Sequence, residues 1–90
     1  MNKKFILSKY IESAMFSATY DKLEDNTYAG KIDCCKGVIA FAKSLKECEI
    51  ELQSVLEDWI LVGLKLEHRL PVINEIDLNA DPHYEKMDTL

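Results

Sequence analysis

The sequence contains little glycine and little proline, with 3 glycines and 2 prolines among its 90 residues. The glycines Gly30, Gly37 and Gly63 stand alone, so no glycine-rich loop is present to cradle a phosphate group. Dinucleotide, ATP and thiamine diphosphate chemistry therefore have no support in this chain. Long apolar runs are also lacking: none reaches membrane-spanning length, and the run Phe5-Ile6-Leu7 is too short for a signal peptide.

Cysteine is scarce as well, with 3 residues at Cys34, Cys35 and Cys48. An odd number argues against a closed framework of disulfides. Free thiols fit a reducing compartment, so we expect a cytoplasmic protein.

Positive charge is in deficit, because 11 Lys and Arg residues stand against 16 Asp and Glu residues, for a formal net charge of −5. An acidic surface repels phosphate backbones, which disfavours nonspecific binding of nucleic acid and suits a basic protein partner. A chain of this length forms one small domain with a marginal core. Pairing of two copies would bury more surface, so we expect a homodimer.

The residues that could bind a metal are Cys34, Cys35, Cys48 and His68, and their spacing matches no standard zinc site. Side chains of neighbouring strand residues point to opposite faces, so Cys34 and Cys35 would rarely reach one ion. We therefore expect no metal and no other cofactor.

Groups for catalysis are equally hard to find. Cys48 falls on a predicted buried helix face beside Glu47 and Glu49. Burial and nearby carboxylates raise the pKa of a thiol, so a structural role is favoured over a catalytic one. His68 and His83 have no serine or cysteine motif nearby. The sequence thus favours a binding protein over an enzyme.

The first half of the chain predicts a small sheet. Phe5 to Ser13 is read as a short helical turn, and the alternation from Ala14 to Tyr20 predicts a first strand. A turn follows at Leu23 to Asn26, and the second strand is expected from Thr27 to Asp33. A tight connection at Cys34 to Gly37 leads to a third strand from Val38 to Lys43.

A long amphipathic helix comes next, and its start is marked by the capping box Ser44-Leu45-Lys46-Glu47. The helix is expected to run from Leu45 to Leu64 or Leu66. Its apolar stripe includes Trp59, which we read as a core residue rather than as an anchor for a partner. The stripe consists of Leu45, Cys48, Leu52, Val55, Leu56, Trp59, Val62, Gly63 and Leu66.

These elements predict an α+β fold in which one long helix covers a mainly antiparallel sheet of three or four strands. Pro71 favours an extended piece from Leu70 to Ile73, which is the candidate for a fourth, edge strand. Residues 1–73 form the single predicted domain, and residues 74–90 are expected to be an acidic, partly disordered tail. Asn26 and Glu67 stand at a hairpin tip and a helix end, where glycine would ease a positive φ.

The order of these elements from Ser13 to Ile73 resembles the HicB-type antitoxin family. The likeness rests on Tyr28 in the second strand, the turn Asp33-Cys34-Cys35-Lys36-Gly37-Val38, and Ala42-Lys43-Ser44 followed by Lys46-Glu47-Cys48 at the helix start. The resemblance implies a partial ribonuclease H-like fold. It also implies inhibition by binding to a HicA-like toxin, a small basic ribonuclease with a double-stranded-RNA-binding fold and a catalytic histidine.

The resemblance also guides expectations about partners. Many relatives bind their operator DNA through a ribbon or helix-turn-helix module after the core, and because none follows here we expect no direct DNA binding. If the sheet face binds a partner, Lys31 and Asp33 are the exposed polar positions to test first.

Three other readings stay open, and the first is a solitary HicB-like module of unknown role, without a toxin. A short helix, three strands and a long helix are also the order of a double-stranded-RNA-binding module, although the predicted final helix is rich in glutamate. A ribonuclease H-like nuclease would need several convergent carboxylates around Mg²⁺. The predicted strands offer only Asp21 and Asp33 as inward candidates.

Overall fold

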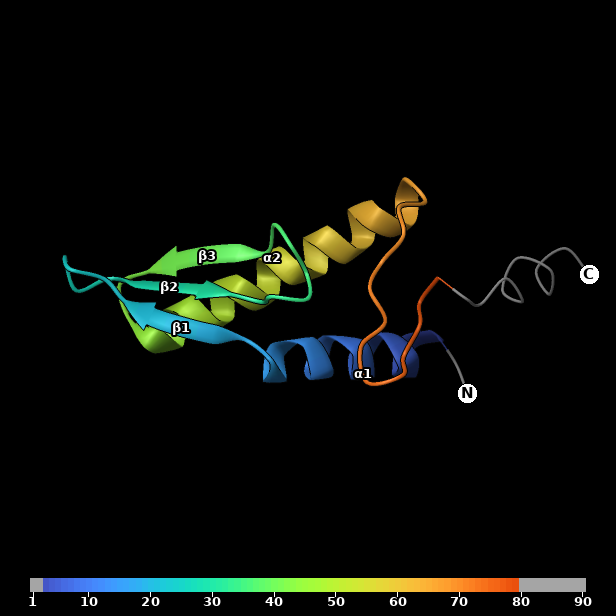
Figure 1. Cartoon of the computed structure of the whole chain (residues 1–90), viewed down its shortest axis with the longest axis horizontal. Coiled ribbons are helices and arrows are strands. Elements are labelled where there is room, and N and C mark those ends of the chain that lie inside the picture. The colour runs from blue at the N-terminus through green and yellow to red at the C-terminus, as the bar shows by residue number, and fades with distance from the viewer. Residues whose placement is uncertain (1–2, 80–90) are drawn as a thin grey trace, which may run out of the picture.

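The computed structural model describes residues 3–79, and their side chains from Ile6 onward. The elements in chain order are α1 (Lys3–Phe16), β1 (Thr19–Lys22), β2 (Tyr28–Lys31), β3 (Ile39–Ala42) and α2 (Leu45–Lys65) (Figure 1). The strands form one antiparallel sheet in the order β1-β2-β3, which confirms the predicted α+β class and the long second helix. Neither described helix is long and apolar enough to cross a bilayer.

Helix α1 replaces the start of the predicted first strand. The prediction of a strand from Ala14 is wrong, because α1 continues to Phe16 and β1 begins only at Thr19. Tyr10 and Ala14 are fully buried one helical turn apart, and Leu7, Ile11 and Met15 pack beside them against the core. This helical burial at three- and four-residue steps outweighs the short alternation that suggested a strand.

A short loop joins β1 to β2, as the turn prediction requires. The Asn26 N–H donates to the Leu23 carbonyl (2.9 Å), and the Leu23 N–H donates to the Thr27 carbonyl (2.8 Å). Asn26 has a φ of 71°, so the prediction of a positive φ there is confirmed. The Asp25 carboxylate accepts hydrogen bonds from the N–H (3.1 Å) and the hydroxyl (2.6 Å) of Thr27, which closes the loop.

Two consecutive tight turns connect β2 to β3. The Cys35 N–H donates to the Ile32 carbonyl (3.0 Å), and the Val38 N–H donates to the Cys35 carbonyl (3.1 Å). Gly37 has a φ of 95°, a conformation that residues with a Cβ rarely adopt. The turns reverse the chain so that β3 pairs with β2 in the register Gly30↔Ala40.

Helix α2 begins and ends as predicted. The Ser44 hydroxyl oxygen accepts a hydrogen bond from the Glu47 N–H (3.1 Å), which confirms the N-cap. The helix stops at Lys65, and Glu67 takes a φ of 60° while the His68 N–H donates to the Gly63 carbonyl (2.8 Å).

The buried stripe of α2 differs from the predicted one at its start and in its second half. Leu45 at the start is exposed, as are Val62 and Leu66, whereas Ile60, which the prediction left out, is buried. Ile60 is buried because α2 extends beyond the sheet and packs there against α1 and the chain that follows α2 (Figure 1). The buried positions are Cys48, Leu52, Leu56, Ile60 and Gly63.

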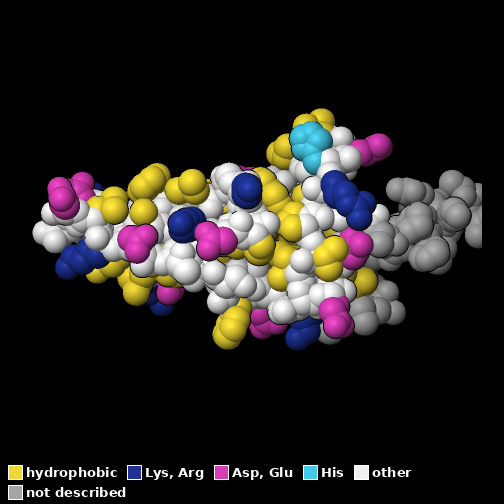
Figure 2. Space-filling view, in the orientation of Figure 1, with side chains coloured by type: hydrophobic (Ala, Val, Ile, Leu, Met, Phe, Trp, Pro, Cys, Tyr) yellow, Lys and Arg dark blue, Asp and Glu magenta, His cyan; other side chains and the backbone are white. Residues whose placement is uncertain are grey.

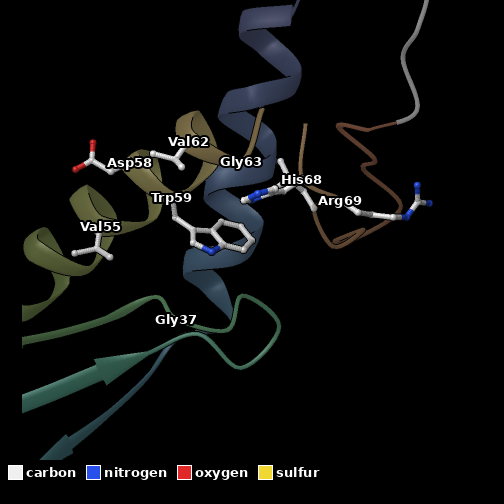
Figure 3. Close-up of a pocket in the computed structure, with 9 residues that line it drawn as sticks. Gly37, Val55, Asp58, Trp59, Val62, Gly63, His68 and Arg69 are labelled. Atoms are coloured by element: carbon white, nitrogen blue, oxygen red, sulfur yellow. The ribbon is translucent and has the colours of Figure 1, made fainter. Parts of the chain in front are cut away.

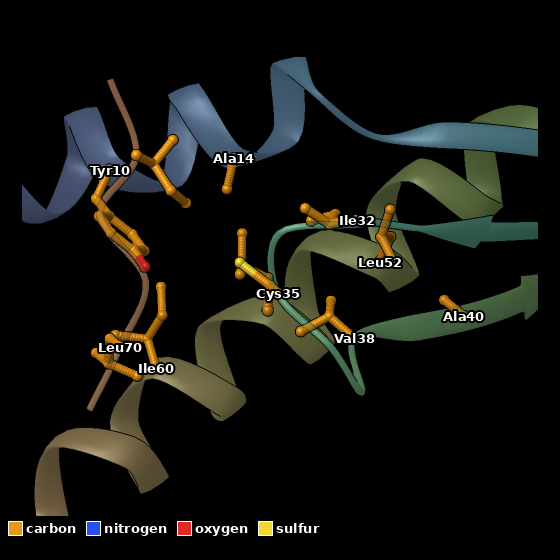
Figure 4. Packing of buried hydrophobic residues seen from close by; sticks show 11 residues of the cluster. Tyr10, Ala14, Ile32, Cys35, Val38, Ala40, Leu52, Ile60 and Leu70 are labelled. Carbon is orange, nitrogen blue, oxygen red and sulfur yellow. The ribbon is translucent and has the colours of Figure 1, made fainter. Parts of the chain in front are cut away.

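The core therefore has two parts joined along α2. The first lies between the sheet and the first half of α2, and the second lies between the rest of α2, α1 and Leu70 (Figure 4). In the second part the Tyr10 hydroxyl donates to the Pro71 carbonyl (2.6 Å). Gly63 admits Leu70, because a Cβ at residue 63 would lie 2.7 Å from a Leu70 methyl carbon.

Residues 67–79, here called the C-terminal strap, return from the end of α2 to α1 (Figure 1). The sheet of the described residues has three strands, so Leu70–Ile73 does not add the fourth edge strand that was considered. The strap instead folds on itself through a bridge between Ile73 and Ile76. Within it Asn79 accepts from the Leu70 N–H (2.7 Å) and donates to the Leu70 carbonyl (2.5 Å). Residues 80–90 of the predicted tail lie outside the described residues.

Candidate partner-binding surface

The two faces of the sheet have different environments. Tyr20, Gly30 and Ala40 are neighbours across the three strands and point toward α2. A Cβ on Gly30 would lie 2.8 Å from ring carbons of Tyr20 and 3.2 Å from the Cys48 Sγ, so only glycine fits there. Helix α2 thereby closes one face of the sheet.

The other face carries no described element and is here called the open sheet face. Because strand side chains alternate, it presents the residues one step from the covered row. Ile39 and Phe41 of β3 belong to it and are 50% and 63% exposed, and Figure 2 shows hydrophobic side chains along this side of the sheet. Exposed apolar side chains of this size next to polar ones are typical of protein contacts. The open sheet face consists of Thr19, Asp21, Ala29, Lys31, Ile39 and Phe41.

The two predicted partner-binding residues lie together at this face. Lys31 is in its row, and Asp33 follows two residues later, with 3.7 Å between Lys31 Nζ and Asp33 Oδ1. Both side chains are exposed, so the ion pair contributes little to folding and is free to exchange partners. The apolar neighbours Ile39 and Phe41 were not predicted as contacts, because the strand is apolar from Val38 to Ala42 and its sequence does not show which residues face outward.

The carboxylates considered for a nuclease do not converge. Asp21 and Asp33 are both exposed, so the prediction that they could point inward is wrong. Among the described residues, no group of three or more His, Cys, Asp or Glu side chains is placed to hold a metal ion.

The three thiols lie in three different settings. Cys48 is fully buried, as predicted, and its Sγ lies 3.6 Å from the Ala40 carbonyl oxygen. Burial, and then the nearby Glu49 carboxylate, raise the pKa of Cys48. Cys35 is buried and Cys34 is exposed, with 3.9 Å between their sulfurs. Burial, followed by the neighbouring Cys34, raises the pKa of Cys35 to about 12, so this thiol stays protonated at neutral pH.

A second concave surface surrounds Trp59, which is half-buried and packs against the core as predicted. The hollow measures about 570 Å³ and lies between the second half of α2, the turn at Gly37 and the start of the C-terminal strap. Figure 3 shows the indole ring facing this space, with His68 and Arg69 on its far side. Its walls are mainly apolar, and its charged groups, Asp58 and Arg69, are of opposite sign.

The excess of negative charge is concentrated in α2. Its sequence holds five acidic residues and two lysines. The acidic side chains are all exposed, which makes this helix the acidic side of the molecule. These residues are Glu47, Glu49, Glu51, Glu57 and Asp58.

Comparison with known proteins identifies relatives of this fold. A sequence profile of a family described as UPF0150-like matches residues 9–71. The chain is similar to a protein of Thermus thermophilus, TTHA0281, known from a crystal structure. The two are 42% identical, with a TM-score of 0.76, over 81% of this chain and 91% of the other. No curated protein matches the chain.

Proposed function

Since the chain belongs to the UPF0150-like family, we propose that it is a HicB-like antitoxin-type protein. It acts in the cytoplasm by binding and neutralising a small basic ribonuclease toxin of the HicA type, and it has no catalysis of its own. The observation that carries the proposal is the open sheet face, where Ile39 and Phe41 are exposed beside the Lys31–Asp33 pair. The resemblance of the Ser13 to Ile73 segment to HicB-type proteins supplies the kind of partner.

The mechanism follows from charge and shape. A ribonuclease needs a basic surface to hold the phosphates of its substrate. A protein with a net charge of −5 attracts that surface from a distance. Phe41 and Ile39 then supply apolar contact area, and Lys31 and Asp33 orient the complex by pairing with groups of opposite charge. Toxin held in this way has its RNA-binding surface covered.

The test uses the small basic protein encoded by the adjacent reading frame. Expressed alone, that protein should stop growth, and co-expression of this chain should restore it and yield a complex on purification. If the neighbour is harmless, or if no small basic protein binds, the antitoxin role is wrong.

Point variants locate the contact. Phe41→Ser should weaken the complex by about tenfold or more, as is usual for an aromatic contact at the centre of an interface. Ile50→Ser is the matched control, because Ile50 is 62% exposed on α2 and Phe41 is 63% exposed. Lys31→Ala and Asp33→Ala should each have a smaller effect. Equal loss for Phe41→Ser and Ile50→Ser would place the contact elsewhere.

The element order favours one alternative, a module of the double-stranded-RNA-binding type, because the chain runs α1-β1-β2-β3-α2. The charge of α2, with five acidic residues and two lysines, opposes it. A gel shift with double-stranded RNA at physiological salt separates the two. A micromolar affinity would favour the RNA-binding module over the antitoxin.

A further inference from the structure

The connection between β2 and β3 contains two adjacent cysteines in opposite environments. Cys34 is exposed and Cys35 is fully buried, yet their sulfur atoms lie 3.9 Å apart, within hydrogen-bond distance. They can approach each other because they lie in turns rather than in a strand, where neighbouring side chains point to opposite faces. Cys34 and Cys35 are here called the thiol pair. The third cysteine, Cys48, is buried against the Ala40 carbonyl oxygen (3.6 Å).

Cys34 lies in a setting that favours reaction with a solute. It lines an open hollow of about 410 Å³ between the β2–β3 connection and the C-terminal strap. The charged residues that line this hollow with it are both cationic, Lys36 and Arg69. The carboxylate next in sequence, Asp33, is paired with Lys31. Reactive cysteines occur in partly exposed, electropositive settings of this kind, because positive charge favours the thiolate.

Cys35 is placed as the second thiol of a reacting pair. It belongs to the buried core and lies where the two parts of the core meet (Figure 4). Burial, and then Cys34, raise its pKa to about 12, so it keeps its proton and Cys34 is the thiol that meets an oxidant first. Once Cys34 is oxidised, the Cys35 sulfur 3.9 Å away is in position to attack it.

We propose that the thiol pair is a modification site for hydroperoxides, at which Cys34 is oxidised and Cys35 then forms a disulfide with it. In the first step the Cys34 sulfur attacks the O–O bond and becomes a sulfenic acid, while the other peroxide oxygen leaves as water or an alcohol. In the second step the Cys35 sulfur displaces the hydroxyl group of the sulfenic acid, which leaves with the Cys35 proton as water. The thiols thereby lose two electrons and two protons to the peroxide. This inference does not depend on the antitoxin role.

The disulfide of adjacent cysteines is easily reversed. The Cα atoms of neighbouring residues lie about 3.8 Å apart, which is below the about 4.4 Å at which ordinary disulfides begin. Such a bond is strained, and strained disulfides are reduced more readily than structural ones. Thiol reductants should therefore restore the thiol pair, so the modification responds to the balance between peroxide and reductant.

Closing the disulfide changes the packing of the core. The sulfur atoms are 3.9 Å apart and must come within about 2.05 Å, so the buried Cys35 side chain has to move. Its backbone also holds both turns, because its N–H donates to the Ile32 carbonyl (3.0 Å) and its carbonyl accepts from the Val38 N–H (3.1 Å). A sulfur drawn out of a packed core leaves a cavity, and the loop that the bond closes is too short to restrict the unfolded chain. The oxidised protein should therefore be less stable than the reduced one.

Mass spectrometry of the whole chain tests the chemistry. After hydrogen peroxide and then iodoacetamide in denaturant, the wild-type chain should carry one alkyl group, on Cys48, instead of three, and dithiothreitol should restore all three. Cys35→Ser should stop at a sulfenic acid on Cys34 that dimedone traps, and Cys34→Ser should keep its other two thiols free. Cys48→Ser is the matched control and should form the disulfide as the wild-type chain does. Three free thiols after peroxide, or a disulfide between two chains as the main product, would overturn the proposal.

Urea unfolding of the same samples tests the effect on the fold. The midpoint of the peroxide-treated wild-type chain should shift to lower urea and return after dithiothreitol, whereas the midpoint of Cys34→Ser should not respond to peroxide. An unchanged midpoint in a chain whose disulfide has formed would show that oxidation does not reach the core. Neither measurement uses a toxin, so this inference and the antitoxin role can fail separately.

Discussion

Gly30 lies where the covered face of the sheet meets α2, and its missing side chain makes this contact possible. Gly30→Ala would introduce a Cβ 2.8 Å from the Tyr20 ring and 3.2 Å from the Cys48 Sγ. Because the neighbours are packed, we expect the free energy of unfolding to fall by about 1–3 kcal/mol. Urea denaturation measures the loss.

Lys31→Ala is the control for this substitution, because it changes the next residue of the same strand on the exposed side. It should alter the stability by less than about 0.5 kcal/mol. Gly37→Ala should also destabilise, but for another reason: no atom lies within 4 Å of its added Cβ, and the strain comes from its φ of 95°. Equal stability of Gly30→Ala and the wild-type chain would mean that α2 can move away from the sheet.

Buried thiol and phenol groups, Cys35 and Tyr10 above all, make the fold sensitive to alkali. Burial, and then Cys34, raise the pKa of Cys35 to about 12, and burial is also the main cause that raises the pKa of Tyr10. Their ordinary pKa values are about 8.5 and about 10, so the unfolded chain loses these protons at lower pH than the folded one. Stability should therefore be complete below about pH 8.5 and decline as the pH rises toward 12.

Unfolding in urea at a series of pH values from about 7 to about 11 follows this decline. Cys35→Ala removes one of these groups, so its stability is lower at neutral pH but should fall less steeply with pH than that of the wild-type chain. A wild-type stability that is flat or rises over this range would contradict the buried, protonated state of Cys35 and Tyr10.

At the scale of elements, the N-cap at Ser44 defines where β3 gives way to α2. Its hydroxyl accepts the Glu47 N–H at 3.1 Å, and no other described side chain takes this position. Ser44→Ala should lower the free energy of unfolding by about 1 kcal/mol. Ser54→Ala is the matched control, because Ser54 is exposed in the middle of the same helix, and alanine there should be neutral or slightly stabilising. Thermal and urea unfolding of both variants measure the difference.

One side chain, Asn79, pairs the backbone of Leu70 in the C-terminal strap. Asn79 bonds both the N–H and the C=O of Leu70, and its own N–H and side-chain amide donate to Asp77 (2.9 Å each). Asn79→Ala should leave the Leu70 backbone unpaired and lower stability by about 1–3 kcal/mol. Hydrogen exchange should show faster exchange of the Leu70 amide. Asn74→Gly, in the same strap at a φ of 48°, should change neither the exchange rate nor the stability appreciably.

The elements that the sequence predicts well are those encoded by neighbouring residues. The hairpin loop at Asn26 and the cap at Ser44 depend on contacts within four residues, and both are confirmed. The start of β1 depends on packing between distant residues: α1 continues to Phe16, and its Tyr10 and Ala14 are buried against residues from the second half of the chain. No local pattern contains that packing.

On the open sheet face, the sequence predicts the charged residues better than the apolar ones. Lys31 and Asp33 were predicted as exposed neighbours, and the structure places them 3.7 Å apart. Phe41 was not predicted as a surface residue, because phenylalanine in an apolar strand is usually buried. Only the structure shows that α2 covers just one face of the sheet. The same limit applies to Ile60 of α2, whose burial comes from the second part of the core.

At the scale of the whole molecule, the net charge of −5 should control how fast a basic partner arrives. Between about 0.1 M and about 1 M salt, the screening length falls from about 10 Å to about 3 Å, so attraction between exposed charges is largely lost. The association rate with the proposed basic partner should therefore fall steeply over this range, whereas the dissociation rate, which the proposal assigns to contacts such as Phe41, should change little. Stopped-flow or surface-binding kinetics at several salt concentrations measure both rates.

Two variants separate steering from contact. Glu51→Gln with Glu57→Gln removes negative charge from the exposed side of α2 and should slow association without changing dissociation. Phe41→Ser keeps the charge and should speed dissociation instead. If the α2 variant instead speeds dissociation and Phe41→Ser has no effect, the acidic side of α2 is the contact surface. The open sheet face would then not bind the partner.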